Sequence, residues 1–447
     1  MKVNLLEGKL RRAFFTLFAS ALGSTVISTI YASVDIICVG QHSGPTATAA
    51  IASLNPLWSI MLAPGILVGV GGSVMMSNRK GNGNTKEADG FFTVSVILSL
   101  IFSAIVCSLL LIFPRELITF FGGEGNRLEM ACTYMLPVAI VSPSFTLSAT
   151  ISAFMRNDGE VVTPTVATAV GGVINMILDV LLVFTFGLGV LGAGLATAIG
   201  QLVAFLIMAS YFLRKKCTMR FISPKKLSDK LGKIFTLGAS AAIIEIAYAL
   251  TSLAYIRSTL RLFGENHLAV YSTASTVAIM LFCIFNAVGT ALQPLASASF
   301  GAGRHGRVKD ALKISLLTTL ALGAVFTLAV ELFPSLILRM FMDVNDEVMR
   351  VGPAIFRTYL MAIALTGVSI LFTYYFQSVL RRGASVAVSL LRGIVFPLLF
   401  VFLFPAVFGD AALFYSMPAA ELATFIIAIL LFTLGRKEKN NSNSIGD

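Results

Sequence analysis

Residues 162–186 read VTPTVATAVGGVINMILDVLLVFTF, an apolar run interrupted near its end by a single acid, Asp179. A helix of this length reaches across the roughly 30 Å hydrocarbon core of a bilayer. An ionisable side chain there costs roughly 2.5 to 3.5 kcal/mol even on a lenient insertion scale. Asn175 stands one helical turn before Asp179 and shares its face. The stretch therefore predicts a membrane-spanning helix that carries a polar site.

A second apolar run repeats this arrangement. Residues 29–40 read TIYASVDIICVG, in which Tyr31 stands one turn before Asp35. Two acids inside apolar helices are poor choices for structure alone, so we interpret them as an ion or proton site. The alternative is a structural role, in which each acid is hydrogen bonded to the backbone or to the other acid.

Composition sets the class of the whole chain. Of the 447 residues, 57% are hydrophobic and 12% charged, and the mean hydropathy is +0.88. A soluble globule of this composition would expose far too much apolar surface, which indicates an integral membrane protein. The first apolar segment, from about Ala13 to Gly40, is too long for a signal peptide and is expected to be a retained span.

Runs of about 20 or more apolar residues predict an all-α fold with twelve transmembrane helices. Their expected limits are 12–40, 50–78, 91–113, 129–155, 162–186, 188–213, 233–261, 268–298, 311–333, 351–380, 384–408 and 411–435.

The distribution of basic residues supports this count. With the N-terminus in the cytoplasm, most of the 33 Lys and Arg residues fall in cytoplasmic segments, and the largest cluster runs from Arg214 to Lys233. This is the positive-inside pattern, and it places both termini in the cytoplasm. The net charge of +11 is thus a signal of topology and lipid contact, and no nucleic-acid partner is expected.

The chain also contains an internal repeat. IFPRELITFF from Ile112 finds an echo in LFPSLILRMF from Leu332, roughly half the chain later. Because six spans are an even number, the two halves enter the membrane with the same orientation, as parallel repeats around a central cavity. The predicted domains are an amino-terminal lobe of residues 1–215, a basic linker of residues 216–232 and a carboxyl-terminal lobe of residues 233–447.

Polar residues of the first half fall in one layer of the membrane. From the expected span ends, Asp35 lies roughly 8 Å deep, Asp179 roughly 10 Å and Thr197 roughly 13 Å, all measured from the outer side. Carboxylate, amide and hydroxyl oxygens suit a sodium ion, and two neighbouring carboxylates suit a shared proton. The candidate sodium ligands are Asp35, Asn175, Asp179 and Thr197.

Three stretches carry a resemblance to a known family. They are FMRNDGEVVTPTVATAVGGVINMILDVLLVFTFGLGVLGAGLATAIGQ (154–201), YASVDIICVG (31–40) and QPLASASFGAGRHGRVKDALK (293–313). Together they resemble the multidrug and toxic compound extrusion (MATE) family, in its DinF-like and MepA-like bacterial branch. The residues that match the family's amino-lobe cation site are Tyr31, Asp35, Asn175, Asp179 and Thr197.

The resemblance implies a multidrug efflux antiporter of the bacterial cytoplasmic membrane. It is expected to export bulky, amphiphilic and often cationic drugs in exchange for sodium ions or protons. A monomer in the lipid bilayer is expected, with no cofactor other than the coupling ion. Family members often have a proline in spans 1 and 7 where this chain has Ser20 and Ser240, so a bend of span 1 would need Gly23 as a weaker hinge.

The second half offers fewer acids. Glu245 and Glu421 lie near the expected midplane and are candidates for contact with a cationic substrate; the alternative is a structural carboxylate satisfied by Ser or Tyr neighbours. Gln201 and Gln377 are candidates for the substrate cavity or for helix packing. Arg392 is expected to extend toward the cytoplasmic side.

Other functional classes fit less well. A flippase for lipid-linked sugars would need several cavity arginines or lysines for a pyrophosphate. Apart from the first and last three residues of each span, the spans hold only Arg257, Arg357 and Arg392. A membrane enzyme would need a nucleophile with a base, or a metal cluster, at membrane depth. The three histidines are far apart in the sequence, so no metal site is expected beyond sodium. Substrate, coupling ion and direction of transport stay open at this point.

Overall fold

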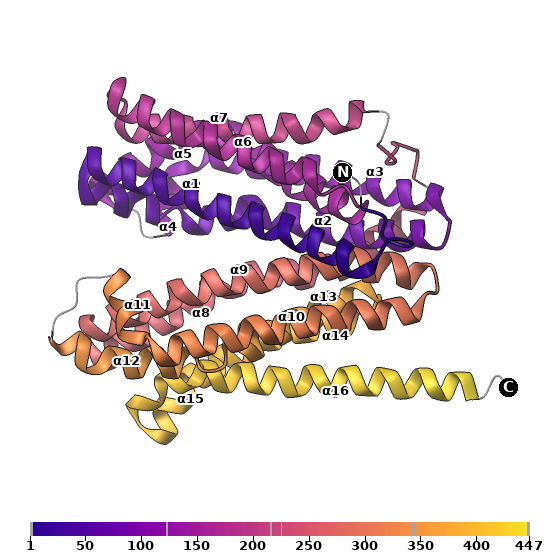
Figure 1. The fold of residues 1–447 in the computed structure, drawn as a ribbon. Coiled ribbons are helices and arrows are strands. Elements are labelled where there is room, and N and C mark those ends of the chain that lie inside the picture. The colour runs from indigo at the N-terminus through magenta and orange to yellow at the C-terminus, as the bar shows by residue number, and fades with distance from the viewer. Residues whose placement is uncertain (1–2, 122–123, 215–216, 225, 342–345, 445–447) are drawn as a thin grey trace. The chain divides into compact units, whose positions relative to one another are not determined.

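The computed structural model describes residues 3–121, 124–214, 217–224, 226–341 and 346–444. Apart from short connections, these residues are helical, and no strand occurs among them (Figure 1). The α-helices are α1 (Leu10–Ala52), α2 (Asn55–Gly81), α3 (Thr85–Ile112), α4 (Pro114–Phe120), α5 (Gly125–Asn157), α6 (Val162–Asp179), α7 (Gly189–Ser210), α8 (Leu227–Phe263), α9 (Glu265–Gly301), α10 (His305–Leu332), α11 (Pro334–Phe341), α12 (Asp346–Leu360), α13 (Ile363–Ser378), α14 (Arg382–Leu390), α15 (Phe396–Phe408) and α16 (Ser416–Ser444).

The predicted number of membrane spans is confirmed. Within the described residues, 12 helical segments are long and apolar enough to cross a bilayer. Some spans are composite. The fifth span continues from α6 into a π-helical turn, Val180–Thr185. The tenth consists of α12 and α13, and the eleventh of α14, a π-helical turn (Leu391–Val395) and α15.

The predicted internal repeat also appears in the helices. Helices α3 and α10 each contain 28 residues, and the same separation along the chain relates both their starts and their ends. Each is followed by a short helix that begins at a proline, α4 at Pro114 and α11 at Pro334. Proline suits the first helical position, because its backbone nitrogen needs no partner there. The repeated FP sequence therefore marks the same local structure in both halves.

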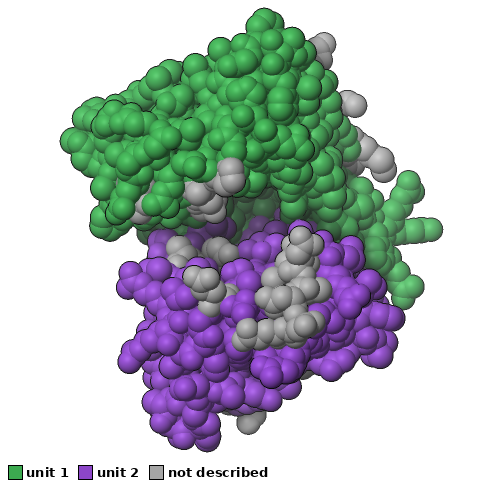
Figure 2. Space-filling view, turned by 90° about the vertical axis from the view of Figure 1, so that its left-hand side faces the viewer, with its two compact units in different colours: residues 1–242, 297–308 green, residues 243–296, 309–447 purple. Residues whose placement is uncertain are grey.

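The chain divides into two compact units, coloured green and purple in Figure 2. Unit 1 comprises Met1–Ala242 and Ser297–Val308, and unit 2 comprises Ile243–Ala296 and Lys309–Asp447. Helices α8 and α9 thus each contribute residues to both units. The lobe boundaries expected from the sequence stay a prediction.

Helix α1 is uninterrupted at Gly23, the weaker hinge that the sequence offers, and at Ser20. Ser20 and Gly23 lie in continuous helix, and the non-helical backbone within α1 is at Gly44, with φ of 80°. The Ser20 hydroxyl donates a hydrogen bond to the Val161 carbonyl, 2.9 Å away, just before α6. The Ser20 side chain therefore joins α1 to its neighbour α6.

Unit 1 packs closely where α6 crosses α7. A Cβ on Gly200 would lie 2.7 Å from the Gly171 carbonyl oxygen and 2.8 Å from Asn175 Cβ. Only glycine allows the two backbones to approach so closely. Likewise, Gly194 of α7 faces the Tyr134 carbonyl of α5 with no room for a side chain. These glycines set the positions of the polar residues one turn away.

The crossing generates a prediction. Gly200→Ala should lower the midpoint of thermal unfolding in detergent, because overpacking at such a contact costs about 1 to 3 kcal/mol. Gly232→Ala is the matched control, since a Cβ there meets no atom within 4 Å in another helical position. The control should unfold at the same or a higher temperature, because alanine favours helix. Equal midpoints for the two variants would contradict the close crossing.

Candidate functional site

Four polar side chains of unit 1 form a series of contacts that starts at Asp35. The Tyr134 hydroxyl, from α5, donates a hydrogen bond of 2.6 Å to Asp35 Oδ2. The same hydroxyl lies 3.1 Å from Thr197 Oγ1 on α7. Asn175 of α6 donates from Nδ2 to that threonine oxygen over 3.4 Å. Four helices thus bring carboxylate, phenol, hydroxyl and amide into one buried cluster.

Acceptor atoms in this cluster exceed the donors. Both carboxylate oxygens of Asp179, Asp35 Oδ1 and Asn175 Oδ1 are buried, and none accepts a hydrogen bond from a described residue. Asp179 is fully buried, and the two carboxylates lie close enough for their charges to interact. Buried acceptors without a donor are costly, so the arrangement favours a bound cation or a proton. These hard oxygen atoms fit a sodium ion in chemical type.

The backbone around Asp179 departs from the regular α-helix. Asp179 is the last residue of α6, and the π-helical turn Val180–Thr185 follows it directly. Such turns concentrate at functional sites, because they shift the register of side chains around the helix. Here the change of register begins at the most deeply buried acid of the unit.

Tyr134 is the site residue that sequence reasoning missed. The predicted phenol was that of Tyr31, but among the described residues the phenol on Asp35 comes from Tyr134. Tyr31 instead faces α6, where a Cβ on Gly172 would lie 2.8 Å from its ring. The available signal was a lone tyrosine near the start of the fourth span. The place of Tyr31 in the cation site stays a prediction.

The two glutamine candidates hold helices together. Gln201 donates from Nε2 to the Ser144 carbonyl and to Ser148 Oγ, each at 3.1 Å. Gln377 is buried and accepts a 2.8 Å hydrogen bond from Gln293 Nε2. These contacts favour the helix-packing interpretation over a place in the substrate cavity.

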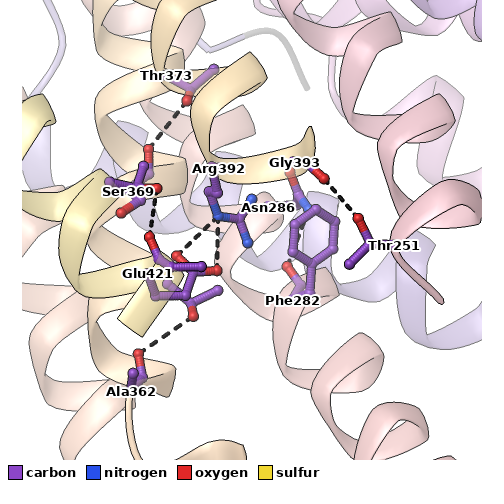
Figure 3. Close-up of polar contacts among 12 residues, drawn as sticks. Thr251, Phe282, Asn286, Ala362, Ser369, Thr373, Arg392, Gly393 and Glu421 are labelled. Carbon is purple, nitrogen blue, oxygen red and sulfur yellow. Dashed lines mark hydrogen bonds and ion pairs between the residues drawn. The ribbon is translucent and has the colours of Figure 1, made fainter. Parts of the chain in front are cut away.

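Unit 2 contains a different arrangement, an internal ion pair (Figure 3). Arg392 Nε lies 3.1 Å and 3.2 Å from the two carboxylate oxygens of Glu421. The guanidinium carbon lies 5.1 Å from the centre of the Phe282 ring. Glu421 is 2% exposed, so an unpaired charge at this position would be severely destabilising.

The prediction that Arg392 extends to the cytoplasmic side is therefore wrong. Its side chain is held within unit 2 by Glu421 on α16 and by Phe282 on α9. A buried acid and an aromatic face together compensate the guanidinium for the water that it loses.

The ion pair lines a cavity of about 300 Å³ within unit 2. Glu245 of α8 also lines it, so both acids proposed for substrate contact reach one space. Most of the remaining lining is apolar or aromatic, including Tyr271, Phe282, Tyr359, Ile279, Ile363 and Met417. An apolar cavity with a few charged groups has the character of a small-molecule site.

No cluster of three or more His, Cys, Asp and Glu side chains suited to a metal occurs in the described parts of the chain. A cation at Asp35 and Asp179 would depend on oxygen atoms from amide and hydroxyl groups as well.

Twelve spans in two repeated units, with ionisable groups inside the spans, define a multi-pass membrane protein built as secondary transporters are. The family model MatE matches residues 20–181 and 240–403. The chain belongs to the MatE family.

Relatives and solved structures agree with this assignment. The chain is 26% identical to the multidrug export protein MepA of Staphylococcus saprophyticus, over 92% of this chain and 91% of that protein. It is 25% identical to MepA of Staphylococcus aureus, with the same coverage. An outward-facing multidrug resistance MATE family transporter matches its fold with a TM-score of 0.89, at 21% identity and 99% coverage of both chains. MATE in a bent conformation matches with a TM-score of 0.91, at 20% identity and the same coverage.

The hydrogen bond on Asp35 generates a second prediction. Tyr134→Phe should lower the unfolding midpoint at neutral pH more than Tyr255→Phe does. Both tyrosines are fully buried, but the Tyr255 hydroxyl contacts the neutral Ser416 hydroxyl at 2.6 Å. A hydrogen bond to a charged group contributes about 1.5 to 3 kcal/mol, against about 1 for a neutral pair. Equal losses would show that Asp35 carries no charge in this bond.

Proposed function

We propose that this chain is a secondary active exporter that expels bulky, amphiphilic, often cationic compounds in exchange for sodium ions or protons. The observation that carries the proposal is the set of buried oxygen atoms without donors at Asp35, Asn175 and Asp179. The family and the multidrug export proteins among its relatives support the direction and the broad substrate class. The proposed location is the bacterial cytoplasmic membrane, with both termini in the cytoplasm and the chain acting as a monomer.

The proposed coupling follows from the cost of buried charge. While Asp35 and Asp179 face water, their carboxylates are hydrated and can take up a sodium ion or a proton. Binding neutralises them and lowers the cost of enclosing the site away from water. An ion that binds more tightly to the closed arrangement of unit 1 lowers the affinity of the protein for the drug. By thermodynamic linkage, bound drug lowers the affinity for the ion by the same factor. A proton gradient of one pH unit supplies about 1.4 kcal/mol per proton, enough for about a tenfold drug gradient.

The flippase alternative receives less support from unit 2. A pyrophosphate needs several uncompensated cations, whereas Arg392 in the described cavity is paired with Glu421. Glu245 adds a further negative charge to the same lining. The cavity therefore favours cations over polyanions.

The coupling site generates a third prediction. Asp35→Asn and Asp179→Asn should each abolish ethidium efflux, because neither variant can exchange a counter-charge at the site. The double variant should be no worse than either single variant, since the two acids act as one unit. Efflux from cells with matched membrane expression is the measurement.

Asp310→Asn provides the matched control, because this aspartate is exposed near the start of α10. Its substitution should leave ethidium efflux unchanged. Additive partial losses at Asp35 and Asp179 would contradict a shared site.

The antiport mechanism generates a fourth prediction. In detergent, adding sodium or lowering the pH should weaken equilibrium binding of a cationic dye to the wild-type protein. The Asp35→Asn variant should lose this response, because its site no longer exchanges ions. Comparing sodium and pH separately identifies the coupling ion. A dye affinity that is insensitive to both conditions in the wild-type protein would exclude the mechanism.

A further inference from the structure

A short segment from the second half of the chain belongs to unit 1. It comprises residues 297–308, the end of α9 and the start of α10, and we call it the α9–α10 segment. A Cβ on its Gly301 would collide with the Asn78 carbonyl oxygen of α2. Likewise, a Cβ on Gly81 of α2 would collide with the Ala298 carbonyl oxygen. Glycine at both positions therefore allows the backbones of α2 and the α9–α10 segment to meet directly.

Residues 3–8, which we call the strap, are joined to the α9–α10 segment by hydrogen bonds. Both arginines of the segment, Arg304 and Arg307, donate to backbone carbonyls of the strap. These hydrogen bonds run from Arg304 Nη1 to Leu6 (2.8 Å), from Arg307 Nε to Leu5 (3.1 Å) and from Arg307 Nη2 to Gly8 (2.9 Å). Because the donors are charged, such bonds are stronger than those between neutral groups. The planar guanidinium of Arg307 holds two carbonyls at once.

The other end of the strap is fixed to the turn between α5 and α6. The Val3 N–H donates a hydrogen bond of 2.8 Å to the Gly159 carbonyl. Gly159 has a φ of 82°, and a Cβ there would collide with the Val3 carbonyl oxygen. Only glycine adopts this backbone conformation readily and also leaves room for the strap. The strap thus links a turn of the first half of the chain to the α9–α10 segment of the second half.

Together with the strap, polar side chains of unit 1 line a cavity of about 370 Å³. Helix α2 contributes Ser77 and Lys80, and the end of α5 contributes Asn157 and the following Asp158. Lys80 Nζ lies 2.6 Å from Asp158 Oδ1, so the charged groups of this lining compensate each other. Segments with few buried apolar contacts open at a low free-energy cost. A strap that rests on polar walls and is held by backbone hydrogen bonds can therefore separate from unit 1 without unfolding its core.

We propose that the strap is a latch, which in its closed position holds the α9–α10 segment against α2 and which opens by exchanging its arginine contacts for water. When the latch opens, the segment loses its link to the α5–α6 turn and separates from α2 more often. Arg304 and Arg307 are thus positioning residues that act through the backbone of the strap. The inference goes beyond the proposed export function, because it concerns how the second half of the chain is held to unit 1.

Hydrogen exchange of the purified full chain in detergent tests the latch. The measured peptide covers residues 297–308, whose amides are hydrogen bonded within the turn, as from Arg304 N–H to the Ser299 carbonyl at 2.9 Å. Arg307→Gln should accelerate exchange of this peptide by about tenfold, the factor expected for the loss of a hydrogen bond from a charged donor. A reference peptide from α6 should exchange at the wild-type rate. Lys309→Gln is the matched control, because this lysine is exposed on the same helix.

A second variant releases the strap from its other end. Gly159→Ala places a Cβ against Val3, so exchange of residues 297–308 should again become faster, although the substitution lies outside that peptide. Gly83→Ala is the matched control. Gly83 has a φ of 83°, so alanine is strained at both positions, but a Cβ on Gly83 meets no atom within 4 Å. The control should leave exchange of the peptide at the wild-type rate.

Combined variants separate one latch from two local effects. Arg307→Gln with Gly159→Ala should exchange no faster than the faster single variant, because either change alone opens the latch. Arg307→Lys keeps the charge but loses the planar fork, so its acceleration should be smaller. Wild-type exchange in both Arg307→Gln and Gly159→Ala, with gel filtration showing folded protein, overturns the proposal, as does equal acceleration in Gly83→Ala. The measurement needs no drug and no ion gradient, so its outcome is independent of the export proposal.

Discussion

Both polar sites of this protein depend on one constraint, the cost of holding an ionised group away from water. At Glu421 of unit 2 the constraint is met within the chain, because Arg392 supplies a permanent counter-charge. In unit 1 the described structure places no such cation on Asp35 or Asp179, and several of their oxygens accept no hydrogen bond. A site whose charge is not compensated by the chain must draw its compensation from solution. Exchange with solution is what coupling to an ion gradient requires.

The repeat makes this difference more informative. Val401 stands the same distance before Phe408 as Asp179 stands before Phe186, at corresponding points of the two halves. Unit 2 thus has a buried valine where unit 1 has its most buried acid. The charged residues that line the cavity of unit 2 lie elsewhere, on α8, α16 and the π-helical turn Leu391–Val395. The two units contain corresponding helices, but their polar side chains differ. This difference is expected if one unit exchanges ions and the other contacts the transported molecule.

The sequence predicted the fold well because hydropathy and loop charge report directly on the bilayer. The count of spans and the repeat at Pro114 and Pro334 needed no knowledge of side-chain packing. Tyr134 was missed because the direction of its hydroxyl depends on how α5 packs against Gly194. The direction of the Arg392 side chain was predicted wrongly. The span limits show which side of the membrane is nearer, but they do not show that its partner Glu421 lies on another helix. The depth of a residue in the membrane follows from the sequence, but the side chains that it contacts depend on how the helices rotate and pack.

The two π-helical turns lie next to charged residues of the sites. One begins directly after Asp179 and the other contains Arg392, so each unit has its irregular turn at its charged site. A regular helix would present these side chains at positions fixed by its period, and the sequence would then predict their direction. The extra residue of a π turn breaks that period and shifts the direction of the side chains around it. Arg392, which lies inside one of these turns, is thus the charged residue whose direction the helical period could not predict.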